Sequence, residues 1–310
     1  MAVFNIVEYL EQQKSLVDRT LERYLTRERR QYPESLNQAM HYGVFSGGKR
    51  LRPILTLATG ELFGGQRKWL LPFACALELI HTYSIIHDDL PALDDDDLRR
   101  GGLASHKVFG EGIALLAGDA LLTEAFHLMS RPELLRALKP NLLLELIHEI
   151  SYASGANGMV GGQAIDLEAE GREVPIDVVE SIHGLKTGAL IFTAARVGAR
   201  IAGATATDMR RVSRYAKLLG LAFQIADDIS DTEGQNGRLR QLGEGEKEKR
   251  KATYPSIVGL PKAKARVREL VRLCLKEVEV FGKKADPLRG IARYVMGQAL
   301  NDQPVVPSNF

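Results

Sequence analysis

The sequence contains little cysteine, almost no net charge and no long uninterrupted apolar run. Cys75 and Cys274 are the only cysteines among 310 residues, so neither a disulfide framework nor a four-thiolate zinc site can be built. So few thiols are typical of a reducing compartment, and we expect a cytoplasmic protein. Because 41 basic residues face 39 acidic ones, the net charge of +2 gives no overall support for binding nucleic acid.

Signals for membrane insertion and for domain boundaries are also scarce. No apolar run approaches the roughly 18 residues of a membrane-spanning helix, so no transmembrane segment is expected. The N-terminal stretch lacks the basic start and apolar centre of a secretory signal. Ser/Gly linkers and low-complexity tracts are lacking as well, so residues 1–310 are expected to form a single domain.

Helical periodicity runs along most of the sequence, whereas the alternation typical of strands is almost absent. Apolar residues recur at spacings of three, four and seven, as on one face of a helix. The stretches with this pattern are about 4–24, 52–63, 69–87, 112–130, 141–154, 177–200, 208–230, 262–282 and 287–300. Glycine and proline fall mostly between them, so the sequence predicts an all-α helical bundle.

Two acidic clusters follow strongly apolar stretches. The first reads DDLPALDDDD over 88–97, and the second reads DDISD over 227–231. A solvated charge run is the ordinary explanation, but carboxylates at the end of a buried helix need a counter-charge. Asp227 and Asp231 are four residues apart and share a helical face, where like charges repel. Carboxylate oxygens suit Mg²⁺, which keeps waters and shares its shell with substrate phosphates.

Basic side chains near predicted helix ends complement these clusters. Each is more often a surface charge than a ligand, but arginine forks bind phosphate oxygens with two donors at once. Acidic clusters, magnesium and several cations together predict a site for a diphosphate. The cations are Lys49, Arg50, Arg52, Arg99, Arg100, Lys186 and Lys251.

One stretch imitates a nucleotide-binding motif. Residues 43–49 read GVFSGGK, which matches the first seven positions of a P-loop. The next residue is Arg50 rather than the Ser or Thr that binds magnesium, and no strand-like run precedes the stretch. We therefore do not expect a P-loop.

The residues that carry this chemistry also carry a resemblance. In chain order they form the motifs GGKRLRP, IHDDLPALDDDDLRRG, FGE, LAGDAL, GGQAIDL, KTGAL, FQIADDISD and KATYP. From about residue 40 to 260 the chain closely resembles the trans-isoprenyl diphosphate synthases (polyprenyl synthetases), and among them the bacterial farnesyl diphosphate synthases, or geranyltranstransferases. The resemblance implies an all-α fold around a central cavity, a homodimer, and three Mg²⁺ ions in each substrate-bound active site.

The resemblance also implies roles for individual residues. The metal ligands would be Asp88, Asp89, Asp94, Asp227 and Asp231, with Asp228 in a supporting position. Isopentenyl diphosphate would be bound by Lys49, Arg52, His81 and Arg100. The allylic diphosphate would be bound by Arg99, Lys186, Thr187, Gln224 and Lys251. His81 precedes Asp88 by seven residues, so both fall near one helical stripe.

The implied reaction is the head-to-tail (1'-4) condensation of isopentenyl diphosphate with dimethylallyl or geranyl diphosphate. Tyr83, the fifth residue before the first acidic motif, would then be a floor that limits the growing chain, with the small Ser84 beside it. An ordinary core tyrosine is the other explanation. We expect the C15 product, farnesyl diphosphate, and the nearest alternative is a C20 geranylgeranyl diphosphate synthase.

Other functions stay open at this point. His87 and Asp88 could be the His-Asp pair of an all-α metal phosphohydrolase, although the second acidic cluster would then be unexplained. A non-catalytic subunit would be expected to lose an acidic motif, and a cyclising terpene synthase would use similar metals. Two positions depart from the family's pattern: Arg240 stands near an expected lysine, and Ser230 replaces a large aliphatic residue.

Overall fold

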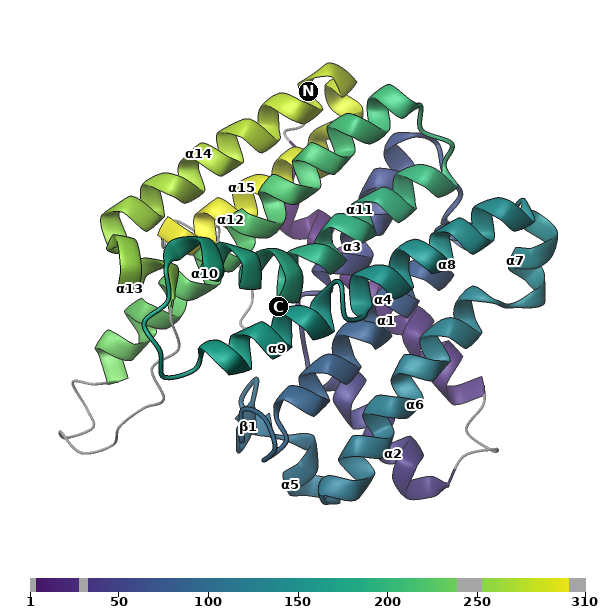
Figure 1. The fold of residues 1–310 in the computed structure, drawn as a ribbon. Helices are drawn as coiled ribbons and strands as arrows, with labels where there is room; N and C mark the ends of the chain where they lie inside the picture. Colours follow the sequence, from purple (N-terminus) through teal and green to yellow (C-terminus); the bar gives the residue numbers. More distant parts are fainter. Residues whose placement is uncertain (1–3, 28–32, 239–252, 301–310) are drawn as a thin grey trace.

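The computed structural model describes residues 4–27, 33–238 and 253–300, and nearly all of the regular structure in these ranges is helical (Figure 1). The α-helices are α1 (Ile6–Arg27), α2 (Glu34–Phe45), α3 (Leu51–Leu62), α4 (Arg67–Asp88), α5 (Ser105–Phe109), α6 (Glu111–Met129), α7 (Pro132–Ala137), α8 (Pro140–Ser154), α9 (Met159–Ala169), α10 (Ile176–Ile182), α11 (Ala189–Ile201), α12 (Ala206–Arg238), α13 (Tyr254–Val258), α14 (Leu260–Val278) and α15 (Asp286–Leu300). A π-helix, η2 (His183–Gly188), joins α10 to α11, and a 3₁₀-helix, η3 (Glu279–Ala285), joins α14 to α15. A short antiparallel hairpin pairs β1 (Leu98–Arg99) with β2 (Gly102–Leu103). The predicted all-α class is confirmed.

Most predicted helices are present, with ends shifted by a few residues. The stretches that correspond to one helix each are those of α1, α3, α4, α6, α8, α12 and α15. The stretch at 177–200 is divided by η2, and the one at 262–282 ends in η3. The sequence did not predict α2 or α9, nor the short helices α5, α7 and α13. In α9, Gly161 and Gly162 lower the helix propensity, and packing against η2 stabilises the helix instead. A single domain over 1–310 stays a prediction.

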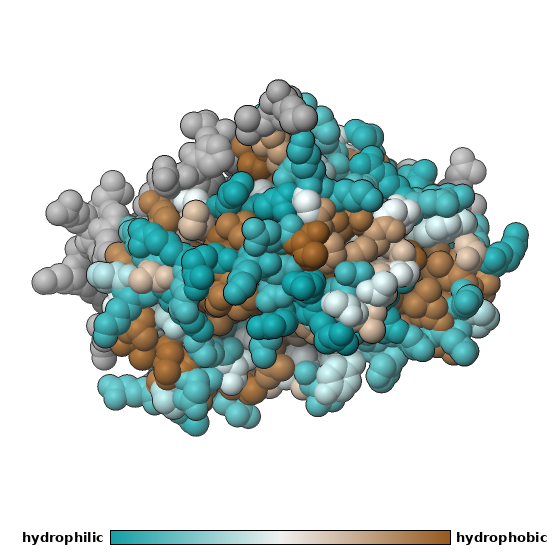
Figure 2. All heavy atoms as spheres, turned by 90° about the horizontal axis from the view of Figure 1, so that it is seen from above, coloured by the Kyte–Doolittle hydropathy of each residue, from teal (hydrophilic) through white to brown (hydrophobic). Residues whose placement is uncertain are grey.

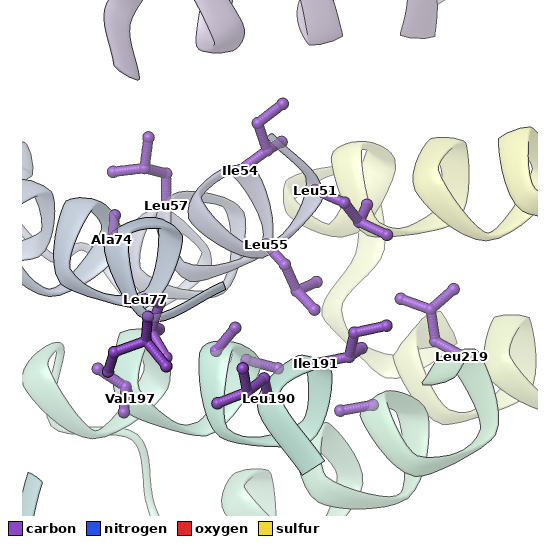
Figure 3. Packing of buried hydrophobic residues seen from close by; sticks show 14 of the residues in the cluster. Leu51, Ile54, Leu55, Leu57, Ala74, Leu77, Leu190, Ile191, Val197 and Leu219 are labelled. Carbon is purple, nitrogen blue, oxygen red and sulfur yellow. The ribbon is translucent and has the colours of Figure 1, made fainter. Parts of the chain in front are cut away.

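The buried core is centred on α3, α4 and α11. Side chains of α4 are buried on all sides between Leu70 and Ile86, so this helix has no solvent face over most of its length. In Figure 3, side chains of α11 such as Ile191 point toward Leu55 of α3, and Val197 lies beside Leu77 of α4. This packing fixes the end of α4, where the first acidic motif begins.

Two helical stretches in the described part are long and apolar enough to cross a membrane. They are Arg67–Asp88 and Glu111–Ala137. The sequence analysis looked for uninterrupted apolar runs, whereas polar residues such as Glu78 interrupt these stretches and only their average is apolar; that the chain has no transmembrane segment stays a prediction. In α4, 72% of the most apolar stretch is buried inside the protein. A helix in a protein core can be as long and as apolar as one that crosses a membrane. Hydrophilic residues dominate the face shown in Figure 2, with hydrophobic residues in separate patches.

Candidate active site

The first acidic motif begins on the last residue of α4 and folds back on itself. The backbone N–H of Asp94 donates to the carbonyl oxygen of Asp88 at 2.8 Å, and Asp95 adopts a positive φ of 54°. Asp89 is buried, and its carboxylate lies 3.0 Å from the guanidinium of Arg99. Burial raises the pKa of Asp89 to about 6, and Arg99 opposes that shift. Two residues predicted for metal and for allylic diphosphate are therefore paired with each other here.

Lys186 joins the first acidic motif to α9. Its Nζ lies 4.0 Å from Oδ2 of Asp88 and donates to Oδ2 of Asp166 at 2.8 Å. Thr187 follows it on η2 and is half-buried. The close approach of the two helices depends on Gly162, because a Cβ there would lie 2.3 Å from the backbone nitrogen of Lys186. π-helical turns are frequent at functional sites, since the extra residue redirects nearby side chains.

A pocket beside this lysine borders Asp94. It is lined by Asp94, Gln163, Asp166, Leu167, Ala169, Glu170 and Ile182. The Oε1 atom of Gln163 is buried there and has no hydrogen-bond partner within the described part of the chain. The sequence analysis quoted the motif GGQAIDL but assigned no role to Gln163 or Asp166. Their spacing of three residues would place both on one face of a helix, but the sequence predicted no helix over Met159–Ala169, so the shared face was missed.

The second acidic motif lies on α12, close to Lys49. Burial raises the pKa of Asp227 to about 6, and the nearby Lys49 lowers it while Asp231 raises it further. The ammonium group of Lys49 lies 5.5 Å from the ring centroid of Phe223, one helical turn before Asp227. Lys49 was predicted to bind isopentenyl diphosphate, and the structure brings it to the edge of the second motif.

Asp228 faces the protein, and both of its oxygens have partners. Oδ2 accepts the backbone N–H of Tyr254 at 2.7 Å and lies 3.2 Å from Nε2 of His183. Oδ1 lies 3.4 Å from Nε2 of Gln224. The side chain thus connects α12 to η2 and to the start of α13. His183 was not singled out from the sequence, although it precedes Lys186 by three residues on the same turn.

The predicted groups for isopentenyl diphosphate gather around Arg52 and His81. Burial lowers the pKa of Arg52 to about 10, and Glu78 and Asp227 raise it again. Burial, together with Arg52 and Arg100, lowers the pKa of His81 well below its usual range, so the ring is neutral at pH 7. Nε of Arg52 is buried and has no hydrogen-bond partner among the described residues. An unsatisfied guanidinium donor beside a neutral imidazole suits an anionic ligand.

The residues predicted to set product length lie on α4, and His87 connects one of them to α6. Tyr83 is buried, and its ring meets the ring of His87 edge to face with centroids 5.7 Å apart. His87 Nε2 lies 2.9 Å from the carbonyl oxygen of Leu115, and a Cβ on Gly118 would lie only 2.1 Å from that nitrogen. Ser84 donates its hydroxyl to the carbonyl of His81 at 2.9 Å. Lys251 and Arg240 lie outside the described residues.

The donor set fits magnesium that is completed by a ligand. Across the described ranges, no three His, Cys, Asp or Glu side chains gather closely enough to hold an ion by themselves. Mg²⁺ does not need such a cage, because one or two carboxylates, waters and substrate phosphates commonly complete its shell. Asp88 and Asp94 on one side and Asp227 and Asp231 on the other supply only hard oxygen donors, as that arrangement requires.

Helices around two acidic motifs and a cation cluster define an isoprenoid synthase of the all-α type. The chain belongs to the polyprenyl synthetase family, whose sequence profile matches residues 33–286. The family, the fold class and the prenyltransferase class predicted from the sequence are confirmed.

Individual relatives cover nearly the whole chain. A farnesyl diphosphate synthase of Geobacillus stearothermophilus is 45% identical over 285 residues, covering 91% of this chain and 95% of that protein. A geranylgeranyl diphosphate synthase of Cyanophora paradoxa is 40% identical over 296 residues, covering 95% and 97%. The solved structure of an FPP/GFPP synthase from Zymomonas mobilis superposes with a TM-score of 0.79 at 39% identity, covering 93% and 99%.

Proposed function

We propose that this chain joins isopentenyl diphosphate to dimethylallyl and then geranyl diphosphate, forming farnesyl diphosphate and releasing diphosphate. One observation carries the proposal: the π-helix η2 places His183 at 3.2 Å from Asp228 and Lys186 at 4.0 Å from Asp88. One helical turn thus contacts both acidic motifs. A diphosphate held between the motifs would lie against Lys186, and the cations around Arg52 would hold the second diphosphate.

Magnesium would be held by Asp88 and Asp94 of the first motif and by Asp227 and Asp231 of the second. When bound, it supplies positive charge that neutralises the allylic diphosphate as its C–O bond breaks. We propose the three ions that the resemblance implies. The position of Asp227 supports a cation there: burial raises the pKa of Asp227, Lys49 opposes this, and Asp231 and Asp228 add to it, so a cation would favour the ionised carboxylate.

The protein's own groups bind and orient the two substrates. Lys186 lies where it can donate to the allylic diphosphate, and the unsatisfied Nε of Arg52 can donate to isopentenyl diphosphate. Neutral His81 can donate one N–H without adding charge near the reacting carbon. We propose that Gln224, Thr187 and Lys251 complete the allylic side.

The proposed reaction begins with heterolytic cleavage of the allylic diphosphate. Its C–O bond breaks, and both electrons leave with the diphosphate. The double bond of isopentenyl diphosphate attacks the resulting allylic cation, and a proton is lost from the adjacent carbon. No described side chain is an evident base, so the released diphosphate is the proposed acceptor. The protein contributes positioning and electrostatics rather than a nucleophile.

We propose a C15 product, with Tyr83 as the floor of the chain-growth cavity. The support is that Tyr83 is buried on α4 five residues before Asp88, with its ring braced against His87. The printed names of the relatives differ in product length, from farnesyl to geranylgeranyl and FPP/GFPP synthase. A C20 product is therefore the second candidate.

We also propose that the enzyme is a cytoplasmic homodimer. Large apolar side chains are exposed on α6 and α8, namely Leu115, Leu116, Leu144 and Tyr152. A second pocket between α8 and α11 continues this apolar surface through Leu144, Tyr152 and Phe192. A second copy would cover an apolar surface of this kind. Both cysteines are buried free thiols, as suits a reducing compartment.

The test is a product assay with labelled isopentenyl diphosphate, Mg²⁺ and either dimethylallyl or geranyl diphosphate. We expect linear farnesyl diphosphate from both starters, identified by chromatography after dephosphorylation. A mainly C20 product would favour the second candidate. Cyclic hydrocarbons, or phosphate release from nucleotides without isoprenoid turnover, would reject the proposal.

A further inference from the structure

Arg50 is buried inside the protein although it stands among the proposed substrate-binding cations. It is 3% exposed, and each of its three side-chain nitrogens has a partner. Nε donates to Asp18 at 2.8 Å, NH1 donates to Glu78 at 2.8 Å, and NH2 donates to the carbonyl oxygen of Val44 at 2.5 Å. Because the guanidinium is buried and each nitrogen already donates within the protein, Arg50 is not placed to bind a diphosphate, and its contacts tie α1, α2 and α4 together.

These contacts hold an unusual backbone turn. Arg50 adopts a left-handed conformation with φ of 51°, which is rare for a residue with a side chain. Gly47 and Gly48 before it also have positive φ, of 108° and 126°. Three of the four positions from Gly47 to Arg50 therefore have a positive φ, and such a backbone needs fixed contacts to persist. The Arg50 ion pairs provide such contacts at the end of this turn.

This turn in turn fixes the positions of neighbouring cations. Arg100 donates to the carbonyl oxygen of Gly47, and a Cβ on Gly48 would lie 2.7 Å from its NH1. Lys49 lies within the turn, and Arg52 lies in the first turn of α3, which follows it. Any shift of the turn would therefore move the cations proposed for isopentenyl diphosphate together.

Glu78 connects Arg50 and its turn to α4. It is 2% exposed, and it precedes His81 by three residues on one helical face. Its carboxylate also opposes the effect of burial on the pKa of Arg52. The buried carboxylate thus binds Arg50 in the turn, and its charge favours the charged form of Arg52, whose Nε has no partner among the described residues.

We propose that the Arg50–Glu78 ion pair is a positioning device for the isopentenyl diphosphate site, because it fixes the turn that carries the site's cations. This inference rests on the proposed function. It assigns a specific role to two residues that touch no substrate. If the ion pair were merely structural, its removal would lower the stability of the protein without affecting the binding of one substrate more than the other.

The test is steady-state kinetics with each substrate varied in turn, for Glu78→Gln, Arg50→Lys and Asp18→Asn. We expect KM for isopentenyl diphosphate to rise about tenfold or more in the first two, while KM for geranyl diphosphate changes less than about twofold. Asp18 is partly exposed, so its variant should fold and show a smaller rise in the same direction.

Asp286→Asn is the matched control. Arg289 pins the turn at η3 through Asp286 at 2.6 Å and the carbonyl oxygen of Gly282 at 2.5 Å. It also donates to the carbonyl oxygen of Val278, and none of these three partners is a candidate site residue. This variant should lower the melting temperature without changing either KM. Equal changes in both KM values, or an unchanged KM for isopentenyl diphosphate in folded Glu78→Gln and Asp18→Asn, would overturn the inference. Failure of the wild type to condense the two substrates would instead reject the proposed function.

Discussion

Nε2 of His183 lies 3.2 Å from Oδ2 of Asp228, and this pair joins the π-helix of the site to the second acidic motif. The same carboxylate oxygen accepts the backbone N–H of Tyr254. Lys186 extends from the same π-helix toward the first motif. The position of the proposed allylic-diphosphate lysine therefore depends on a contact made three residues earlier.

His183→Ala should weaken both stability and catalysis. The buried Asp228 would lose a partner, which costs about 1–3 kcal/mol of unfolding free energy. Because η2 also carries Lys186, we expect KM for the allylic diphosphate to rise more than KM for isopentenyl diphosphate. Chemical denaturation and two-substrate kinetics measure the two effects. A loss of stability with both KM values unchanged would show that the pair does not position Lys186.

Asp88→Ala and Asp227→Ala should each reduce kcat by about 10²–10³-fold or more. Each substitution removes a proposed ligand of Mg²⁺, whose positive charge would stabilise the departing diphosphate. Circular dichroism should show a folded protein in both cases. Asp97→Ala is the control from the same acidic run, since its exposed carboxylate pairs with Lys107 on the surface. Near-normal turnover in the Asp88 and Asp227 variants would remove the metal assignment.

The pH dependence of stability should change when ligand binds. The pKa values of Asp89 and Asp227 are raised from 3.8 to about 6, so the folded state holds these protons more tightly than the unfolded state. In metal-free protein these two groups contribute stability that is present at low pH and lost as pH rises through about 6. Magnesium with diphosphate would compensate the charge of the ionised carboxylates. The gain in melting temperature on adding both should therefore be larger above this window than below it.

Asp227→Asn provides the check on this dependence. The amide cannot ionise, so its contribution to the pH dependence of stability in metal-free protein should disappear. If the wild type gains the same melting temperature from magnesium and diphosphate on both sides of the window, the raised pKa of Asp227 plays no part in binding.

Tyr83→Ala should lengthen the products from C15 toward C20, as measured by chromatography of the dephosphorylated alcohols. Gly118→Ala tests the support behind that ring, since a methyl group would overlap His87, which braces Tyr83. We expect Gly118→Ala to broaden the product distribution with a smaller loss of kcat than an aspartate variant. If both variants still stop at C15, the floor lies elsewhere.

The sequence predicted the helices and the acidic motifs because both are local signals. Apolar periodicity placed α4 and α12, and the two acidic motifs were read directly. The sequence put the second motif at the end of its helix, whereas α12 continues to Arg238, so Asp227 lies inside the helix. The partners of those carboxylates are not local. Asp166 meets Lys186 only because Gly162 lets α9 approach η2, and no periodic pattern marks that contact.

Other features were hidden for a related reason. Arg50 appeared as one more cation beside Lys49, and only its burial against Glu78 separates it from the substrate-binding groups. Arg99 and Asp89 were assigned to different ligands, whereas the fold pairs them. Residue type predicts what a side chain can bind, but burial and direction depend on packing between distant helices.

Calorimetric binding of inorganic diphosphate in the presence and absence of Mg²⁺ tests the central claim most directly. Wild type, Asp88→Ala, Asp227→Ala and the double variant form a complete cycle. If one metal-bound diphosphate bridges both motifs, either single substitution should abolish most of the magnesium-dependent affinity, and the double variant should lose little more. Binding that does not depend on magnesium, or losses that simply add, would contradict a shared site.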